Sequence, residues 1–311
     1  MNDKKKYRLV TRSDFDGLVC AVLLKELDLI DEIDFVHPKD MQDQRIPITG
    51  RDIITNLPYV EGCHLAFDHH LSETSRLDTR RANHIIDPHS PSAARIVYNH
   101  FGGKAAFPRV SETMMDEVDR ADSAQYNIDE ILDAKGWVLL NFLMDARTGL
   151  GRFKNFRVSN YQLMMQLIEY CRDHSIEQIL SLPDVLERSE LYAHHRPLAE
   201  AQIKRCANVH GNLVVLDLRD EDIIFATNRF LIYALFPQCN ISMHVMWGVK
   251  QSNTVFAIGK SITDRSSKTN VGELCLKYRG GGHAAAGTCQ VANDDADQIK
   301  VDLIAAITAE G

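Results

Sequence analysis

Short apolar runs of strand length alternate with helical patterns through the first hundred residues, and this alternation restricts the possible folds more than any other feature. Helical patterns cover 18–30 and 91–101. The runs that we expect to be strands are 7–11, 34–37, 52–55, 63–67 and 84–87. Such alternation is typical of an α/β sheet with parallel strand pairs. The sequence therefore predicts an N-terminal, largely parallel sheet with flanking helices.

The pattern becomes mainly helical after residue 110 and returns to strands near residue 209. We expect helices at 111–125, 130–144 and 161–174, and a long connecting helix at 187–208. Strands at 213–216, 241–245 and 254–258 then alternate with helices at 221–235, 271–278 and 296–309. A chain of 311 residues exceeds the size at which one core usually keeps growing. We therefore expect domains at 1–186 and 209–311, the second a smaller α/β domain, with 187–208 between them.

Charge and cysteine usage limit the partners and the compartment. The formal net charge is -8 and the sequence pI is about 5.9, which argues against a broad basic surface for long duplex nucleic acid. The seven cysteines are scattered and never spaced as CxxC, as expected of reduced thiols in the cytoplasm. No apolar run is long enough to span a bilayer. We expect a cytoplasmic protein with no membrane partner, and a homodimer only as the generic oligomer.

Acidic and imidazole side chains gather where the predicted strands end. Two acids stand in the tight loop after the first strand, an Asp-His-His triplet follows the run 63–67, and one more acid lies on the helix 111–125. A helix cap would explain one acid of the first pair but not both. The residues are Asp14, Asp16, Asp68, His69, His70 and either Asp119 or Asp122. Mn²⁺ or Mg²⁺ suits mixed Asp/His ligands, so a phosphate ester is the expected substrate.

A second candidate site lies near the C-terminus. Three consecutive glycines allow backbone N–H groups to approach an anion, although a glycine turn before a strand is the alternative. Basic side chains around the triplet favour a phosphate cradle. The segment comprises Arg279, Gly280, Gly281, Gly282 and His283, with Arg265 upstream. The loop 145–152 also carries two arginines and two glycines that could serve an anion, but we interpret it as a surface loop between helices.

With these motifs the chain resembles the DHH phosphoesterase superfamily, in its two-domain form with a DHH-associated C-terminal domain. The resemblance is carried by 11–17, by Asp68-His69-His70 and by 280–283. It is closest to the exopolyphosphatase-related and oligoribonuclease/pAp phosphatase-like proteins. The resemblance implies an N-terminal domain that binds two manganese ions, a C-terminal domain that recognises substrate, and an active site in the cleft between them.

The resemblance also assigns roles to single residues. Asp14 and Asp16 match the acids of the first motif, and His69 matches the metal-binding histidine, with Asp68 and His70 as its neighbours. Asp122 best matches a further ligand acid, with Asp119 as the reserve choice. The phosphate-binding loop matches Gly280, Gly281, Gly282 and His283, accompanied by Arg265. Arg279 would add positive charge beside that loop.

Two positions depart from the family pattern. Arg12 stands where a metal-binding histidine is normal, and Asn56 stands where a bridging aspartate is normal. A guanidinium cannot ligate a metal, and an amide bridges two cations less well than a carboxylate. We therefore expect one tightly bound ion, with a second position weakened. Arg12 could instead contact phosphate directly.

Two functions follow from this pattern. The first is a metal-dependent phosphohydrolase or phosphodiesterase acting on a small phosphorylated substrate such as a short oligonucleotide, a nucleotide or polyphosphate. The second is a nucleotide- or phosphate-binding regulatory protein whose hydrolysis is weakened by Arg12 and Asn56. The combined presence of Asp14, Asp16, Asp68, His69 and Asp122 favours the enzyme.

Overall fold

The computed structural model describes residues 6–70, 73 and 81–311, which form two compact units. The first unit comprises Met1–Gln125 and Ala134–Leu191, and the second comprises Tyr126–Asp133 and Tyr192–Gly311. Among the described residues, no helix combines the length and the apolar character needed to cross a membrane. All seven cysteines are free thiols, and all but Cys206 are buried.

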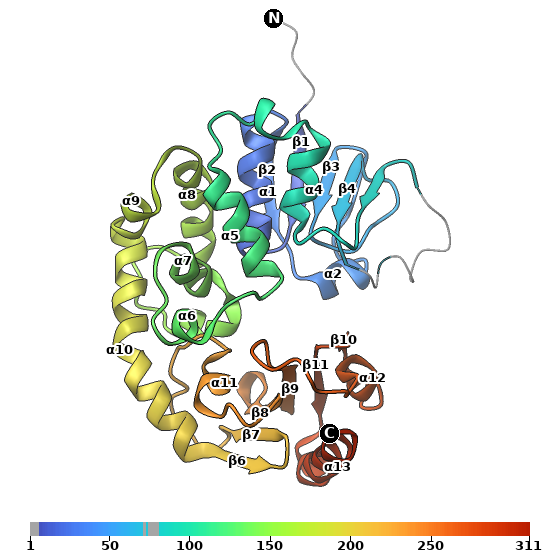
Figure 1. The fold of residues 1–311 in the computed structure, drawn as a ribbon. Helices are drawn as coiled ribbons and strands as arrows, with labels where there is room; N and C mark the ends of the chain where they lie inside the picture. The colour runs from blue at the N-terminus through green and yellow to red at the C-terminus, as the bar shows by residue number, and fades with distance from the viewer. Residues whose placement is uncertain (1–5, 71–72, 74–80) are drawn as a thin grey trace, which may run out of the picture. The chain divides into compact units, whose positions relative to one another are not determined.

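The first unit is built on a five-stranded parallel sheet, as the sequence predicts (Figure 1). The strand order is β2-β1-β3-β4-β5, and each neighbouring pair is parallel. Parallel strands direct their carboxyl ends to one edge, where ligands of α/β proteins bind. The strands are β1 (Tyr7–Thr11), β2 (Ile30–Phe35), β3 (Asp52–Thr55), β4 (Leu65–Asp68) and β5 (His84–Ile86).

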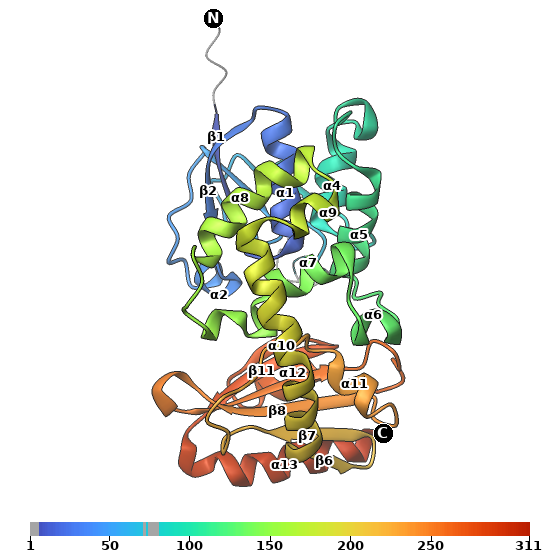
Figure 2. The same ribbon diagram turned by 90° about the vertical axis from the view of Figure 1, so that its left-hand side faces the viewer.

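Helix α1 lies at the centre of this unit. It is apolar around its whole circumference, and its residues from Phe15 to Leu24 are buried. It packs against α4, α5 and α8 on one face of the sheet (Figures 1 and 2). The helices of the unit are α1 (Phe15–Glu26), α2 (Pro38–Gln42), α4 (Ala93–His100), α5 (Glu112–Asp122), α7 (Gly136–Met144), α8 (Asn160–Asp173) and α9 (Ile176–Leu180). Three short 3-10 helices complete it: η1 (Gly103–Ala105), η2 (Ala146–Thr148) and η3 (Leu150–Arg152).

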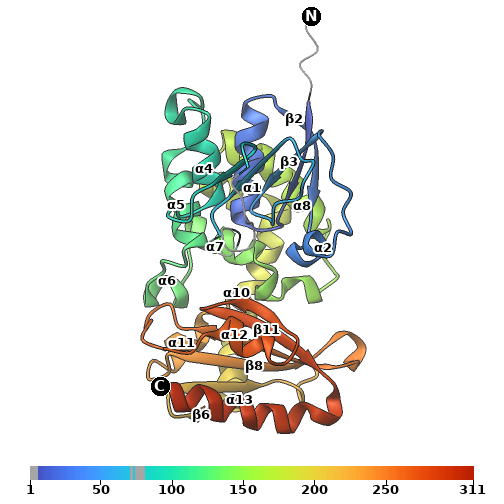
Figure 3. The same ribbon diagram turned by 90° about the vertical axis from the view of Figure 1, so that its right-hand side faces the viewer.

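The other face of the sheet is covered by α2 and loops (Figure 3). Met41 of α2 joins a buried cluster with Val10, Ile54 and Ala66 from three strands. Successive residues of a strand point to opposite faces, so both faces of this sheet are buried and its strands read as continuous apolar runs.

The second unit contains a six-stranded mixed sheet with strand order β10-β11-β9-β8-β7-β6. Only β7 and β8 pair in parallel. Helices α12 and α13 cover one face, while Tyr233 of α11 donates a hydrogen bond to the Gly259 carbonyl on the other. The strands are β6 (Ala207–His210), β7 (Leu213–Asp217), β8 (Ile241–Trp247), β9 (Thr254–Lys260), β10 (Gly281–His283) and β11 (Ala286–Val291). The helical elements are α6 (Ile128–Leu132), α11 (Leu231–Leu235), η4 (Val249–Gln251), α12 (Val271–Leu276), η5 (Asn293–Asp295) and α13 (Ala296–Glu310).

Helix α10 (Pro183–Cys206) is common to both units, because the division falls between Leu191 and Tyr192. It corresponds to the connecting helix expected at 187–208, but it begins four residues earlier. The segment Tyr126–Asp133, which contains α6, belongs to the second unit, whereas the sequence pattern groups it with the first.

Several predicted elements are wrong in extent. The helix predicted at 221–235 shrinks to α11, because side chains of α10 hold the preceding segment extended. Gln202 donates to the Ile223 carbonyl and accepts from the Phe225 N–H, and His195 accepts from the Ala226 N–H. The helix predicted at 130–144 is two helices, α6 and α7. Helix α1 covers 15–26 instead of 18–30, and strands β6, β10 and β11 are additional.

Candidate active site

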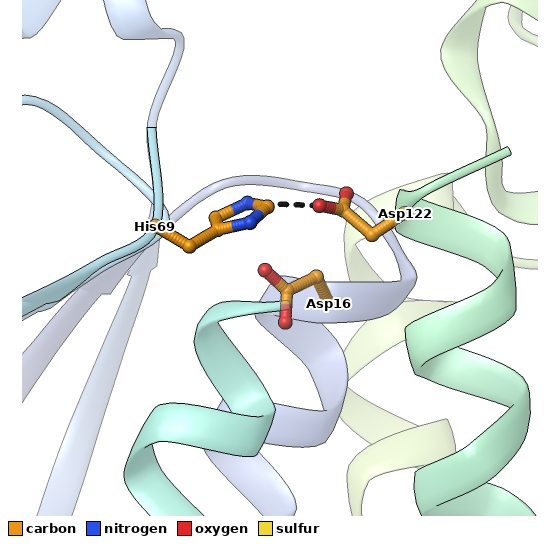
Figure 4. A group of neighbouring side chains, drawn as sticks. All are labelled: Asp16, His69 and Asp122. Carbon is orange, nitrogen blue, oxygen red and sulfur yellow. Dashed lines mark ion pairs between the residues drawn. The ribbon is translucent and has the colours of Figure 1, made fainter. Parts of the chain in front are cut away.

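Three side chains meet beyond the carboxyl ends of β1 and β4. Asp16 comes from the first turn of α1, His69 directly follows β4, and Asp122 is the last residue of α5. They point toward one another (Figure 4), and their ligand atoms all lie within 4.8 Å of one another. The sequence predicts these three residues as metal ligands, and folding brings them together from three separate elements.

Asp16 is buried and held by the N-terminus of α4. The Ala93 N–H donates to Oδ2 at 3.0 Å and the Ala94 N–H donates to Oδ1 at 2.7 Å. Helix N-termini favour anions, yet burial, reinforced by the charge of Asp122, raises the pKa of Asp16 to about 8. The site thus concentrates more negative charge than its surroundings compensate. A divalent cation would relieve that excess.

His69 is oriented by its other ring nitrogen. Nδ1 lies 3.3 Å from the Ser90 carbonyl oxygen, which can accept its proton, and this leaves Nε2 directed at the carboxylates. Nε2 lies 2.8 Å from Oδ2 of Asp122. Burial opposes protonation, but the contact with Asp122 and the nearby acids prevail and raise the pKa of His69 to about 9. A histidine whose Nδ1 is held by a carbonyl presents Nε2 as a metal ligand.

Asp68 organises the triplet from below. Its buried Oδ1 accepts the backbone N–H of His69 at 2.8 Å and that of His70 at 3.2 Å, and lies 2.6 Å from Nδ1 of His70. The side chain of His70 is 38% exposed. Asp68 therefore shapes the turn after β4 and aims both imidazoles.

Asp14 lies beside the three-residue group and is engaged by both residues that depart from the family pattern. Nε of Arg12 lies 3.0 Å from Oδ2 of Asp14, and Nδ2 of Asn56 donates to Oδ1 at 3.1 Å. Asp14 is also the N-cap of α1 and accepts the Gly17 N–H at 3.0 Å. The predicted loop around Asp16 and Gly17 is thus wrong, because both belong to the first turn of that helix.

Asp119 lies one turn before Asp122 but points elsewhere. It accepts a hydrogen bond from Ser92 at 2.6 Å and from Nε of Arg95 at 2.7 Å. Ser92 is the N-cap of α4, the helix whose amides hold Asp16. Asp119 therefore supports α4 and does not join the three-residue group.

Three buried polar atoms around the site have no hydrogen-bond partner among the described residues: Asn56 Oδ1, Asp68 Oδ2 and His69 Nε2. Buried polar atoms are almost always satisfied, so orphans gathered at one place indicate a missing ligand. Two oxygens and one imidazole nitrogen beside Asp16 and Asp122 are a suitable donor set for Mn²⁺ or Mg²⁺. The residues present fit a divalent cation.

The sequence misses part of this arrangement. The groups that hold Asp16 are backbone amides of α4, which leave no signal in residue type. The sequence does single out the loop 145–152, and Arg147 in it is close enough to Asp14 to lower the pKa of that carboxyl, although burial raises it overall.

The glycine segment forms a strand and a tight turn in the second unit. A Cβ at Gly280 would lie 2.3 Å from the Thr288 oxygen, and one at Gly282 would lie 2.2 Å from the Ala286 oxygen. A Cβ at Gly281 would meet nothing within 4 Å. Packing on β11 thus explains the outer two glycines, whereas only the middle one leaves open space for a ligand.

Basic side chains lie near this turn and at the end of β9. Nδ1 of His283 accepts the Ala285 N–H at 3.1 Å, and Nζ of Lys260 donates to the Ser267 carbonyl at 3.0 Å. Arg265 and Arg279 are exposed, and Arg279 has a left-handed φ of 57°. The arrangement offers backbone amides and cations to an anion.

Comparisons with known proteins identify the class of fold. Exonuclease RecJ from Thermus thermophilus in complex with Mn²⁺ matches with a TM-score of 0.51 at 14% identity, covering 98% of this chain and 52% of that one. CDC45 from Entamoeba histolytica matches with a TM-score of 0.51 at 10% identity, covering 98% and 96%. A scan of family models and a search of curated proteins gave no match. The chain belongs to the DHH phosphoesterase superfamily.

One relative is far more similar. The structure of the pGpG-specific phosphodiesterase PggH from Vibrio cholerae is 63% identical in sequence, with a TM-score of 0.85. The match covers 98% of this chain and 100% of that chain. The expected superfamily, the α/β fold and the phosphoesterase class are confirmed.

Proposed function

We propose that this enzyme is a metal-dependent phosphodiesterase whose substrate is the linear dinucleotide pGpG. The observation that carries the proposal is the 63% identity to PggH over essentially the full length of both chains. Among the substrates open from the sequence, it favours a short oligonucleotide over polyphosphate. Hydrolysis would cut the internal phosphodiester and yield two mononucleotides.

The three-residue group would hold one divalent cation, with Mn²⁺ as the expected ion and Mg²⁺ as the alternative. Asp16, His69 and Asp122 supply its ligands, and the orphaned oxygens of Asn56 and Asp68 add donors nearby. Such a cation, when bound, supplies Lewis-acid charge to a phosphoryl oxygen and promotes the deprotonation of water.

The residues around Asp14 support a single tightly held ion. Arg12 and Asn56 both bind this carboxylate, where the family pattern provides ligands for a second cation. The Arg12 guanidinium carries fixed positive charge and, with 34% of its side chain exposed, can also donate to a phosphate oxygen of the substrate. Arg12 thus substitutes for the charge of a second cation but not for its effect on water.

Surrounding groups would keep the site in one geometry. The amides of α4 orient Asp16, the Ser90 carbonyl orients His69, and Asp68 orients His70. Because these groups are in place before substrate arrives, little reorganisation is needed during the reaction. In the second unit, Gly281, His283, Arg265 and Arg279 would bind a phosphate group of the dinucleotide.

Turnover of pGpG by the full chain with Mn²⁺ tests the proposal. We expect hydrolysis of pGpG to pGp-free mononucleotide products, and slower hydrolysis of longer oligonucleotides and of polyphosphate. Tight binding of pGpG without hydrolysis would contradict the proposal and favour the regulatory binding protein. Faster turnover of polyphosphate than of pGpG would contradict the substrate assignment alone.

A further inference from the structure

The loop after α7 has a well-defined backbone. The Asp145 side chain accepts the Arg147 N–H at 2.9 Å, and the buried Thr148 hydroxyl donates to the Phe142 carbonyl at 2.6 Å. Gly149 has a φ of 86° and separates η2 from η3. The two arginines of this loop, Arg147 and Arg152, are thus presented by anchored backbone.

Arg147 faces the acids of the site with part of its guanidinium uncommitted. Its Nε contacts Oδ1 and Oδ2 of Asp145 at 2.7 and 3.1 Å, while Nη1 and Nη2 have no hydrogen bond to any described residue. The side chain is 47% exposed. Asp145 raises the pKa of Arg147 against the effect of burial, and Asp14 and Asp122 add to that rise. Arg147 therefore lies beside the cation site, with two nitrogens available to a ligand.

Arg152 is a cation without a counterion. Within the described ranges it has no hydrogen-bond or ion-pair partner, and desolvation alone lowers its pKa. Its guanidinium lies against Gly149, where a Cβ would come within 2.0 Å of Nη1. A partly desolvated guanidinium without an acid is unfavourable unless an anion binds to it.

The charge balance of the first unit explains why such cations are needed. Asp14, Asp16 and Asp122 repel an approaching phosphate, and Arg12 is already paired with Asp14. A single divalent cation cannot offset both these acids and the substrate charge. Arg147 and Arg152 supply positive charge that this cluster does not neutralise.

We propose that the loop 145–152 is an anion-binding element of the phosphoesterase site, in which Arg147 and Arg152 bind phosphate oxygens of the substrate. The inference rests on the proposed function for its choice of dinucleotide, but not for its choice of phosphate. Arg147 donates its two terminal nitrogens to a phosphate at the cation site, and Arg152 adds a second guanidinium. The glycine at 149 gives Arg152 the room to lie there.

The first test is steady-state hydrolysis of pGpG by the full chain with Mn²⁺. We expect Arg147→Ala to lower kcat/KM about 10- to 100-fold, as loss of a hydrogen-bonded charge does, and Arg147→Lys to restore part of it. Arg152→Gln should raise KM about 3- to 10-fold, with kcat within about twofold of wild type.

Arg51→Ala is the matched control. Arg51 contacts both oxygens of Asp31 through one nitrogen and is 54% exposed, much as Arg147 contacts Asp145. It lies outside the site, so its kinetic constants should stay within about twofold of wild type. Thermal unfolding checks each variant, and Arg147→Lys and Arg152→Gln carry the test if Arg147→Ala does not fold.

The second test measures the affinity for inorganic pyrophosphate by calorimetry without metal, which is independent of turnover. We expect Arg147→Ala and Arg152→Gln each to weaken it at least about fivefold. Kinetic constants and affinity all within twofold of wild type would overturn the anion site, as would a kinetic loss without a loss of affinity. If wild type does not cleave pGpG but the variants still lose pyrophosphate affinity, the proposed substrate fails and the anion site stands.

Discussion

The two candidate binding regions are built in opposite ways. The cation site of the first unit is buried, and protein groups hold its acids and imidazoles: α4 amides for Asp16, a carbonyl for His69 and Asp68 for His70. In the glycine segment of the second unit, Gly281, Gly282 and His283 are exposed. Its shape comes from missing side chains instead of from hydrogen-bonded ones.

The difference teaches how each region can discriminate. A preorganised, desolvated site gives strong electrostatic stabilisation to a reacting phosphoryl group. An exposed glycine turn gives close backbone approach with little bias toward one ligand. We therefore expect chemistry to fail when the first region is altered and affinity to fail when the second is altered.

The largest effect should come from removing the cation ligands. Asp16→Ala combined with His69→Ala should reduce kcat/KM for pGpG by at least about 10³-fold, because two of three clustered ligands are lost. The measurement is product formation with Mn²⁺. The control is Asp173→Asn, an exposed acid paired with Arg172. Hydrolysis that survives the double substitution would show that the reaction occurs elsewhere.

The glycine segment offers a comparison between neighbouring positions. Gly282→Ala should destabilise the protein by about 2 kcal/mol or more, because its Cβ would meet the Ala286 oxygen at a φ of 153°. Gly281→Ala should leave the unfolding temperature unchanged, since its Cβ meets nothing.

The functional readout at Gly281 is KM. We expect Gly281→Ala to raise KM for pGpG about tenfold with kcat nearly unchanged, because a methyl group would block approach of phosphate to the backbone. An unchanged KM would remove this segment from the substrate site and leave the glycines with a purely structural role.

The residues around Asp14 can be tested by metal stoichiometry. Arg12→His combined with Asn56→Asp should raise the number of tightly bound Mn²⁺ ions from one to two per chain, because an imidazole and a carboxylate replace groups that ligate poorly. Calorimetric titration of the metal-free protein gives the number. Two equally tight ions in the unaltered protein would contradict the single-ion assignment.

The smallest effect concerns stability, where each unit has one Arg–Asp pair on its sheet. Asp52 is almost fully buried, and its pKa is lowered because hydrogen bonds from Arg8 and Thr49 outweigh the opposing effect of burial. Asp217 pairs with Arg219 but is 25% exposed. Asp52→Asn should lower the free energy of unfolding at pH 7 by about 1–2 kcal/mol, and Asp217→Asn by about half of that.

The pH dependence gives the sign. A carboxyl whose folded pKa is depressed stabilises the protein above its unfolded pKa, and that contribution is lost as the pH falls through the folded pKa. The difference between wild type and Asp52→Asn, measured by urea unfolding, should therefore shrink from neutral pH toward about pH 3. A constant difference over this range would mean that the pair contributes through packing only.

Much of the fold follows from local pattern. Continuous apolar runs mark strands buried on both faces, so the parallel sheet is predictable from residues such as those of β1 and β3. The helix predicted at 221–235 is wrong because hydrogen bonds from Gln202 and His195 override the local helical pattern. Side-chain contacts with distant partners are not encoded in any short window.

The sequence by itself determined the residue types of the site: Asp16, His69 and Asp122 follow from motif position and ligand chemistry. Only the tertiary structure decided which acids share a cation and which do not. Asp119 turns away to Arg95, and Asp14 is engaged by Arg12 and Asn56. The physical reason is that ligation depends on angstrom-scale convergence of separate elements, and chain order specifies the elements but not the direction in which each side chain points.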